Sequence, residues 1–382
     1  MDCSCYKFPS VAGSNPVEEK LFLFFFKLKK LFKILNKWRL FLENQIIQDI
    51  MFIQKLYNRL SPKMGQFGNY MLPMTFNKFK TKDVVTKTRE PGFACVFDVS
   101  HMGIFETRRV DLIEEKFLVN LEKFNNKSKL AAVLNSDNFI IDDLIVCDVD
   151  KTKYRLVVNA NTKDYFRNLD DLHEKNKMVI AVQGDYSQKI LENMFSTKLD
   201  DLYFMENRTI IQDAIEICRC GYTGEDGFEL YLNQREGEEI VTNLVDLSLT
   251  SDNVLFGGLI ERDLLRLESG LCLSGTEFGG DINVDFKALN MDFMVDFKFR
   301  KQHNFQSDYT RVGFTDNRPI KKGPILSQDD SEIGFITSSN KSFNLNKFIG
   351  MGYLKKDSVN DKLKGNMELV TLPFIESKYY KK

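Results

Sequence analysis

Two adjacent carboxylates, Asp142 and Asp143, lie inside an apolar segment, FIIDDLIV, at residues 139–146. Burying two carboxylates costs free energy unless something pairs with them, so this segment is a candidate for chemistry. If it is a strand, neighbouring side chains point to opposite faces, and only one of the two can face a given site. That one is a candidate acid or base in a partly desolvated cavity, and the other is structural, capping or solvated. A hairpin corner with both carboxylates in water explains the segment equally well.

A second candidate is the glycine-rich segment RCGYTGEDGFELYL at residues 219–232. Its glycines let the backbone turn tightly and approach a ligand closely. It lacks the lysine of a phosphate-binding loop, and Glu225 and Asp226 would repel phosphate. Glu229 sits at the start of the strand expected to follow, where its carboxylate can accept two parallel N–H bonds from a planar heterocycle. A glycine-rich hairpin with a surface acid is the competing interpretation.

A third segment, GGLIERDLLRLESGLCL at residues 257–273, carries two arginines at helical spacing. Arg262 and Arg266 are four residues apart, so they can share a helix face with apolar neighbours. Arginine on such a face usually has a buried carboxylate partner or an anionic ligand. A helix whose charges of both signs are solvated is the alternative.

The strands and helices that must position these residues follow from the spacing of apolar side chains. Two β-rich runs predict strands, and three runs with apolar residues at helical spacing predict helices. The strands are expected at 153–159 and 178–183, and the helices at 164–175, 238–249 and 259–267. Because strands and helices mix without strict alternation, the fold class is predicted to be α+β. The polar stretch 300–309 predicts a linker, and the short strand-like runs after it predict a small all-β domain.

The composition excludes several classes of protein. The 382 residues include 53 Lys and Arg against 54 Asp and Glu, so the formal net charge is −1 and nucleic-acid binding is not expected. With three His and seven Cys, neither a His-rich metal site nor a dense disulfide scaffold is expected. The cysteines are odd in number and lack the spacing of a disulfide framework, so they predict the reduced thiols of an intracellular protein. Cys218 and Cys220 are interpreted as plain strand residues, not as half of a metal site.

Residues 20–42 differ from the rest of the chain, since Lys and Arg alternate with Leu and Phe and no acid appears before Glu43. The apolar run at 21–26 is too short to span a bilayer, so no stable membrane insertion is expected. A basic amphipathic stretch of this kind is typical of an organelle transit peptide or a membrane-surface segment. We expect residues 1–54 to be an N-terminal extension that contains a transit peptide; a lineage-specific extension or a wrongly assigned start is the alternative.

Taken together, these segments resemble the aminomethyltransferase family, the T-proteins of the glycine cleavage system. Five motifs occur in the family's order and approximate spacing. They are FDVSHMG at 97–103, IIDDLIV at 140–146, residues 219–229, RDLLRLESGLCL at 262–273 and MGY at 351–353. The similarity runs from about Leu56 to the Tyr-Tyr pair at 379–380. A non-catalytic folate-binding protein of the same fold, such as an iron–sulfur cluster assembly factor, is the alternative, but its signature KGCYxGQE differs from RCGYTGED here.

The resemblance implies a three-lobed molecule with tetrahydrofolate as co-substrate in a central channel, no metal, and a small β-barrel as the last lobe. Residues 55–300 would form the folate-binding domain of two lobes, and residues 308–382 the C-terminal β-barrel domain. The implied reaction moves an aminomethyl group from the lipoyl arm of H-protein to tetrahydrofolate, giving ammonia and 5,10-methylenetetrahydrofolate. Lipoylated H-protein is therefore the implied partner, and the mitochondrial matrix is the implied location.

The resemblance also implies roles for single residues. The family's catalytic carboxylate falls on Asp143. The implied substrate- and folate-binding residues are Glu229, Arg262, Tyr379, Tyr222 and Phe293.

The chain departs from the family's pattern at three places. The family's Phe-Ala-Gly-Trp is Phe67-Gly-Asn-Tyr70, so a phenol replaces the indole. The Gly-Gly before the paired aspartates is Asn138-Phe139, which predicts an altered local turn. Residues 283–295 lack a clean counterpart of the family's Thr-Pro-Val-Glu and its following Trp, and Phe293 is the candidate for that aromatic wall.

Overall fold

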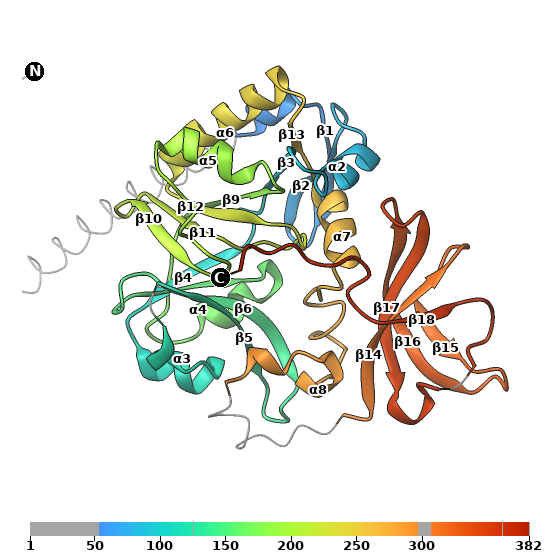
Figure 1. The fold of residues 1–382 in the computed structure, drawn as a ribbon. Helices are drawn as coiled ribbons and strands as arrows, with labels where there is room; N and C mark the ends of the chain where they lie inside the picture. The colour runs from blue at the N-terminus through green and yellow to red at the C-terminus, as the bar shows by residue number, and fades with distance from the viewer. Residues whose placement is uncertain (1–52, 125, 297–306, 361, 382) are drawn as a thin grey trace, which may run out of the picture. The chain divides into compact units, whose positions relative to one another are not determined.

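The computed structural model describes residues 53–381 except 125, 297–306 and 361 (Figure 1). The chain divides into two compact units, Met1–Lys55 and Leu56–Lys382, and three large sheets belong to the second unit. The basic stretch at residues 20–42 lies outside the described residues. Within the described ranges, no helix combines the length and the apolar character that crossing a bilayer requires.

The first of the three large sheets has six strands in the order β10-β11-β12-β9-β3-β13. Its bounds are β10 (Asn207–Ile211), β11 (Ile215–Cys218), β12 (Gly227–Leu232), β9 (Met178–Gln183), β3 (Ala94–Asp98) and β13 (Val254–Phe256). β9 and β12 are central and buried on both faces; β9 therefore reads as an apolar run that ends in Gln183, whereas β12 carries Glu229 among its apolar residues. The helices of this part of the chain are α2 (Thr81–Lys87), α5 (Ser187–Phe195), α6 (Gln234–Thr250) and α7 (Leu259–Glu268).

The second sheet has five strands in the order β5-β6-β7-β4-β8. Its bounds are β5 (Ser128–Leu134), β6 (Ile140–Asp148), β7 (Tyr154–Val158), β4 (Gly103–Thr107) and β8 (His173–Glu174), with helices α3 (Val110–Phe117) and α4 (Lys163–Arg167). Burial alternates along the first half of β6, which separates the two adjacent aspartates onto opposite faces.

The turn between β5 and β6 is where Asn138-Phe139 replaces two glycines of the family pattern. Asn138 has a φ of +67°, a left-handed conformation that asparagine tolerates better than other non-glycine residues. The Oδ1 of Asn135 accepts hydrogen bonds from the backbone N–H groups of Asp137 and Phe139, at 3.0 and 2.9 Å. These bonds close the turn, so the chain still enters β6 although both glycines are replaced.

The third sheet has five strands in the order β15-β16-β17-β14-β18 and its own apolar core. Its bounds are β14 (Tyr309–Asp316), β15 (Gly323–Leu326), β16 (Glu332–Ser342), β17 (Lys347–Lys355) and β18 (Glu368–Val370). A separate hairpin of β1 (Pro62–Phe67) and β2 (Tyr70–Phe76) packs on α7. The remaining short elements are α8 (Phe286–Leu289), η1 (Leu121–Lys123), η2 (Ala160–Thr162), η3 (Asp292–Met294) and η4 (Lys356–Ser358).

The mixed α+β class and most of the expected elements are confirmed. β7, β9 and α7 match their predicted ranges closely, and α6 begins four residues before the predicted range. The helix predicted at 164–175 is wrong, because α4 ends at Arg167 and a left-handed residue, Asp171 with φ +64°, redirects the chain into β8. Leu169 and Leu172 still pack against the core of the second sheet from this turn, which explains the misleading apolar spacing.

The linker predicted at 300–309 falls mostly on residues 297–306, which lie outside the described residues, and Tyr309 already belongs to β14. The small all-β domain expected after it is confirmed as the third sheet.

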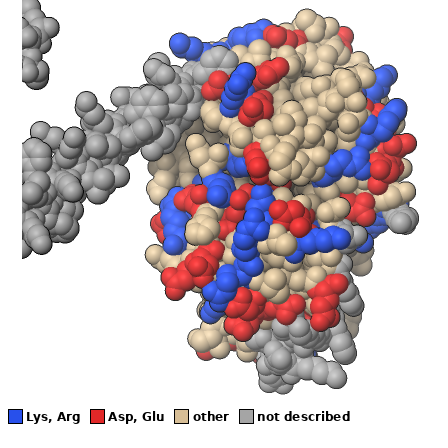
Figure 2. All heavy atoms as spheres, turned by 90° about the vertical axis from the view of Figure 1, so that its left-hand side faces the viewer, with Lys and Arg blue, Asp and Glu red and all other residues tan. Residues whose placement is uncertain are grey.

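Figure 2 shows one face of the molecule, on which blue Lys and Arg and red Asp and Glu are intermixed among uncharged side chains.

Candidate functional site

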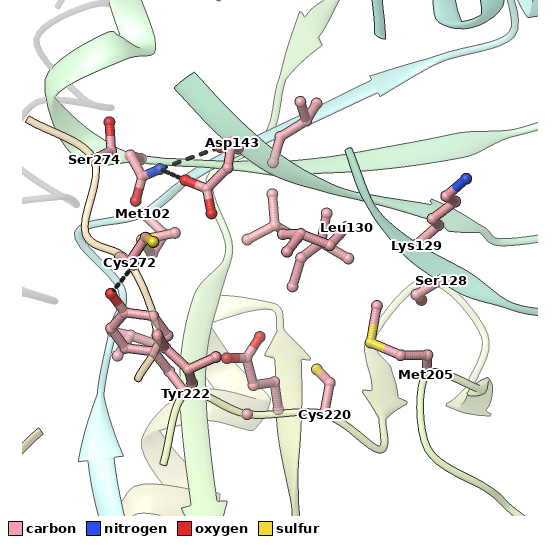
Figure 3. A pocket seen from close by; sticks show the side chains of 18 of the residues that line it. Met102, Ser128, Lys129, Leu130, Asp143, Met205, Cys220, Tyr222, Cys272 and Ser274 are labelled. Carbon is pink, nitrogen blue, oxygen red and sulfur yellow. Dashed lines mark hydrogen bonds between the residues drawn. The ribbon is translucent and has the colours of Figure 1, made fainter. Parts of the chain in front are cut away.

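A cavity of 390 Å³ is lined by all six residues to which the family resemblance assigned a role in the site. Its walls come from the second sheet, the glycine-rich segment with β12, the first turn of α7 and the stretch after that helix. Among the lining residues are Asp143, Glu229, Arg262, Tyr222, Phe293 and Tyr379. Figure 3 shows Asp143 on one side of this cavity, with Tyr222 and Cys220 on the opposite side. We call it the inner chamber.

Asp142 and Asp143 lie in a strand, so the hairpin-corner interpretation is wrong. Asp142 is 0% exposed, and it accepts hydrogen bonds from Nδ2 of Asn159 at 2.8 Å and from the hydroxyl of Thr162. Asp143 is half-buried and faces the inner chamber. The same Nδ2 of Asn159 donates to Oδ1 of Asp143 at 2.7 Å, so one amide orients both carboxylates.

Burial raises the pKa of Asp143 to about 7, and the negative charge of Asp142 beside it adds to that rise. The hydrogen bond from Asn159 acts in the opposite direction, because it favours the ionised form. Burial likewise raises the pKa of Asp142, against hydrogen bonds that lower it. A carboxyl group that titrates near neutral pH in a cavity can both accept and return a proton.

Glu229 projects from β12, where it is paired with Cys218 on one side and Ala181 on the other. It is 6% exposed, so the interpretation as a surface acid is wrong. Within the described part of the chain, its carboxylate accepts a hydrogen bond at Oε2 from the Tyr231 hydroxyl, at 3.0 Å. The other carboxylate oxygen is therefore available to a donor in the inner chamber.

Two of the glycines before Glu229 leave room for side chains of neighbouring segments. A Cβ at Gly221 would lie 1.8 Å from Oε1 of Gln183, and Gly224 has a φ of +77° with Ser269 Oγ 2.2 Å from the position of its missing Cβ. Gln183 Nε2 in turn donates to the Cys220 carbonyl at 3.0 Å. Gly221 nevertheless lines the inner chamber, so the expectation of close ligand approach stays a prediction there, whereas at Gly224 the side chain of Ser269 occupies the space.

The two arginines of α7 have different environments. Arg266 is buried and donates to Glu277 at 2.9 Å and to Asp263 at 2.8 Å, so it has the carboxylate partners that such a position predicts. Arg262 lines the inner chamber, and its guanidinium carbon lies 4.6 Å from the ring centroid of Tyr222. Among the described residues no hydrogen bond or ion pair is found for its guanidinium. Arg262 therefore has no direct ion-pair partner among the described residues, and the negative charge that acts on it most is that of Glu229 on the wall of the same cavity.

Aromatic side chains complete the walls. Tyr222 donates from its hydroxyl to the Cys272 carbonyl, which fixes its ring beneath Arg262. Tyr379 stacks on Phe204 with ring centroids 4.1 Å apart. Phe293, in η3, is 58% exposed and lies where the cavity meets the surface.

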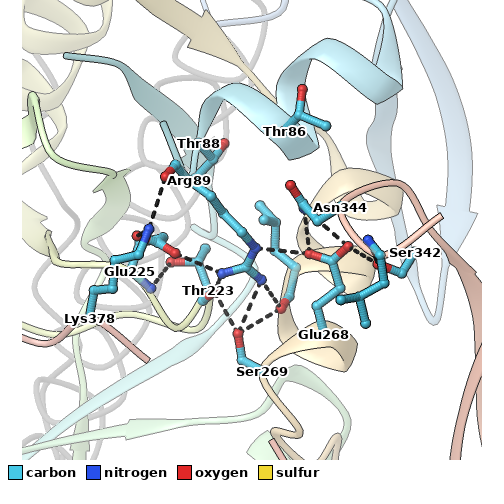
Figure 4. A network of polar contacts seen from close by, with 12 residues as sticks. Thr86, Thr88, Arg89, Thr223, Glu225, Glu268, Ser269, Ser342, Asn344 and Lys378 are labelled. Atoms are coloured by element: carbon cyan, nitrogen blue, oxygen red, sulfur yellow. Dashed lines mark hydrogen bonds and ion pairs between the residues drawn. The ribbon is translucent and has the colours of Figure 1, made fainter. Parts of the chain in front are cut away.

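A largely buried network around Arg89, a residue that the sequence reasoning missed, binds Lys378, the residue before Tyr379 (Figure 4). The Arg89 guanidinium donates to Glu268 and to Glu225, at 2.9 Å each, and to the Thr223 carbonyl at 3.0 Å. Lys378 donates to the Arg89 carbonyl at 2.9 Å and lies 3.3 Å from Glu225. The network thus joins the turn after α2, the glycine-rich segment, α7 and the chain next to Tyr379.

Asn159 was also missed, although it closes a strand that the sequence did predict. A polar residue directly after an apolar strand, in the sheet that carries the paired aspartates, is the signal that could have found it. For Arg89 the sequence offers no comparable signal, because its partners lie 134 to 180 residues away.

No group of three or more His, Cys, Asp and Glu suited to a metal ion occurs within residues that the structure describes. The five cysteines that it describes are all free thiols.

Comparisons with known proteins agree with this architecture. The family model of the GCVT N-terminal domain matches residues 53–299, and that of the glycine cleavage T-protein C-terminal barrel domain matches residues 310–370. An aminomethyltransferase of Staphylococcus carnosus is 31% identical over 339 residues, covering 79% of this chain and 90% of the relative. A mitochondrial aminomethyltransferase of Dictyostelium discoideum is 28% identical over 384 residues, covering 86% and 93%.

A solved structure gives the same result at the level of the fold. The glycine cleavage system aminomethyltransferase T from Bartonella henselae superposes with a TM-score of 0.77 at 25% identity, covering 86% of this chain and 99% of that one. The resemblance noted in the sequence is confirmed: this chain belongs to the aminomethyltransferase family, the T-proteins of the glycine cleavage system.

Proposed function

We propose that this protein transfers the aminomethyl group from the lipoyl arm of H-protein to tetrahydrofolate, releasing ammonia and 5,10-methylenetetrahydrofolate. The observation that carries the proposal is the inner chamber, where Asp143, Glu229 and Arg262 converge on one largely apolar cavity. The proposal is also supported by the names of the relatives, which are aminomethyltransferases.

The side chains of the inner chamber fit a reduced pterin. Glu229 offers a buried carboxylate oxygen to an amino group and a ring N–H, the pair of donors that such a heterocycle presents along one edge. Arg262 offers unpaired N–H donors to a ring carbonyl. The aromatic rings of Tyr222, Phe293 and Tyr379 offer apolar surface to the rest of the molecule.

Asp143 is the proposed catalytic carboxylate. Two folate nitrogens must form bonds to the transferred carbon, and each loses a proton as it does so. A carboxylate whose pKa lies near neutral pH accepts such a proton and passes it on. Asn159 holds this carboxylate in one orientation, which keeps it aligned with a bound substrate.

The experiment that tests the proposal combines two measurements on the full-length chain. Calorimetric titration with tetrahydrofolate measures binding, and formation of methylenetetrahydrofolate from aminomethylated H-protein measures transfer. We expect both. Saturable folate binding without any transfer would instead support a non-catalytic folate-binding protein, and the absence of both would refute the proposal.

We further propose the division of the chain and its location. Residues 55–300 would be the folate-binding domain, residues 308–382 the barrel domain, and residues 1–54 an extension that directs the protein to the mitochondrial matrix. Support for the location comes from the basic stretch at 20–42 and from the mitochondrial relative in Dictyostelium discoideum. Residues 1–55 fused to a fluorescent reporter should enter mitochondria, and a purely cytosolic signal would contradict this location.

A further inference from the structure

A second cavity, of 750 Å³, adjoins the inner chamber, and we call it the outer chamber. Six residues line both cavities and form the neck between them: Met102, Asn159, Tyr222, Arg262, Leu273 and Ser274. The outer chamber extends from this neck to the tip of the β1–β2 hairpin and to α4. A ligand in the outer chamber therefore meets a ligand in the inner chamber beside Arg262 and Asn159.

Lys163, the first residue of α4, lines the outer chamber and is half-buried. Its Nζ donates to the Tyr70 hydroxyl at 3.0 Å and lies 5.2 Å from the centroid of that ring. The described residues provide no carboxylate partner for it. By contrast Arg167, one turn further along α4, is paired with Asp164 at 2.6 Å and with Glu174 at 2.7 Å.

Gly103 allows this placement of the lysine. A Cβ at Gly103 would lie 2.9 Å from Cγ of Lys163 and 2.6 Å from Cγ2 of Val158, so any larger residue would displace the lysine stem. Gly103 ends the motif FDVSHMG, whose His101 lines the same chamber. The motif thus positions the lysine although the two are about sixty residues apart in the sequence.

His101 lines the same chamber as Lys163 and Arg262, and its side chain is uncharged. It is 6% exposed, and its Nδ1 is buried without a hydrogen-bond partner among the described residues. Burial lowers the pKa of His101 to about 3, and the positive charges of Arg262 and Lys163 lower it further, so the imidazole stays uncharged at neutral pH. Of the cations that line the outer chamber, Arg167 and Arg266 are paired with carboxylates. Lys163, Arg262 and the exposed Lys322 have no ion-paired carboxylate among the described residues, and the histidine is uncharged.

The proposed reaction produces one anion that suits this charge. The transferred carbon begins with bonds to sulfur and to the amine nitrogen, and it ends with bonds to two folate nitrogens. When the carbon–sulfur bond breaks, its electron pair stays on sulfur as a thiolate. The two protons lost from the folate nitrogens balance the products, since one completes ammonia and the other finally neutralises the thiolate. Ammonia leaves uncharged, so the thiolate is the group that needs positive charge.

We propose that Lys163 is a catalytic residue that stabilises the departing lipoyl thiolate in the outer chamber, on the side of the neck opposite to the folate. This inference rests on the proposed function, because it takes the sulfur-bearing arm as the second substrate. Lys163 and Arg262 contribute positive charge where negative charge develops, in a site partly shielded from water. Asp143 then receives the proton on the folate side, while Lys163 acts on the sulfur side.

The test compares Lys163→Met, which keeps the apolar stem but removes the charge, with Lys163→Arg, which keeps the charge. Lys189→Met is the matched control, because Lys189 lies 5.3 Å from the Tyr186 ring centroid and lines neither chamber. We expect Lys163→Met to lower kcat by roughly 10²–10³, the usual loss for one electrostatic donor. Lys163→Arg should retain most of the rate, Lys189→Met should equal the parent, and folate affinity should be unchanged in all three.

A second measurement reports on the thiolate without turnover. Dihydrolipoyl H-protein is mixed with the folate-loaded protein at neutral pH, and the ultraviolet absorbance of the thiolate is recorded. The parent should raise this absorbance and Lys163→Met should not. An active parent whose Lys163→Met variant keeps its rate, or raises the thiolate signal equally, overturns this inference alone. A parent that neither binds folate nor uses aminomethylated H-protein overturns the proposed function, and this inference with it.

Discussion

Replacing Asp143 by Asn tests the centre of the proposed mechanism. Asparagine has the same shape, and its carbonyl oxygen can still accept the hydrogen bond from Asn159 that Oδ1 of Asp143 accepts at 2.7 Å. The variant should therefore fold and bind tetrahydrofolate, but it cannot take a proton. We expect turnover to fall by roughly 10²–10⁴, the range for a lost acid or base group. In the parent, kcat should rise with pH around 7, where Asp143 ionises.

The same substitution should change stability with a definite sign. Because the pKa of Asp143 rises on folding from its ordinary 3.8 to about 7, the folded protein loses stability as pH increases through that window. The Asn variant has no such loss, so it should become progressively more stable than the parent from about pH 4 to pH 7. At ~1.4 kcal/mol per pH unit the upper bound is about 4 kcal/mol, which water in the inner chamber reduces for a half-buried group.

The assays are methylenetetrahydrofolate formation, folate titration and urea unfolding at several pH values, each applied also to Asp142→Asn. That control should act through stability, because Asp142 accepts hydrogen bonds from Asn159 and Thr162 and an amide there leaves donors facing donors, at a cost of about 1–3 kcal/mol. If Asp142→Asn abolishes turnover while Asp143→Asn leaves it intact, the assignment is reversed. If neither affects an active parent, the pair is not the catalytic centre.

Three further substitutions separate binding from stability. Glu229→Gln should lose about 1–3 kcal/mol of tetrahydrofolate affinity by calorimetry, and binding equal to the parent would show that the heterocycle lies elsewhere. Arg262→Met should weaken folate binding similarly without lowering the free energy of unfolding, since its guanidinium has no hydrogen-bond or ion-pair partner among the described residues and the methionine stem can still pack on the Tyr222 ring; a clear loss of stability would argue for a structural role. Arg89→Met should lower the free energy of unfolding by about 3–5 kcal/mol in urea, because it leaves Glu268 and Glu225 buried without that cation, and a loss below about 1 kcal/mol would contradict the importance of the network.

The spacing of apolar residues predicted a strand or helix correctly wherever that spacing arose from burial in one regular element. β9 and α7 are examples, since a continuous apolar run and a 3.6-residue period each arise from burial in a regular element. The stretch 164–175 failed because its apolar residues are buried from a short helix and a turn together, which produces the same spacing. The spacing of apolar residues indicates which side chains are buried, but it does not indicate the backbone conformation that buries them.

The paired aspartates show which part of the site could be predicted from the sequence and which part could not. Alternation along a strand predicts that only one of them can face a cavity, and β6 places Asp143 there. Which of the two it would be depends on the side of the sheet that the glycine-rich segment and α7 cover, and a strand's own sequence does not contain this. Asn159 and Arg89 were missed for the same reason, since their partners are set by strand pairing and by packing between distant segments.

The placement of Tyr379 has a consequence for how the protein is made. The backbone N–H of Lys378 donates to the Gly224 carbonyl, and that of Phe204 to the Tyr380 carbonyl, so this segment lies against residues synthesised far earlier. A ribosome delivers the amino-terminal sheets first, at about 5–20 residues per second. The wall that Tyr379 provides is absent until residue 380 has emerged from the ribosome. Under the proposed function, folate therefore cannot act as a folding template for the nascent chain through this wall, and it would stabilise the complete inner chamber only in the released protein.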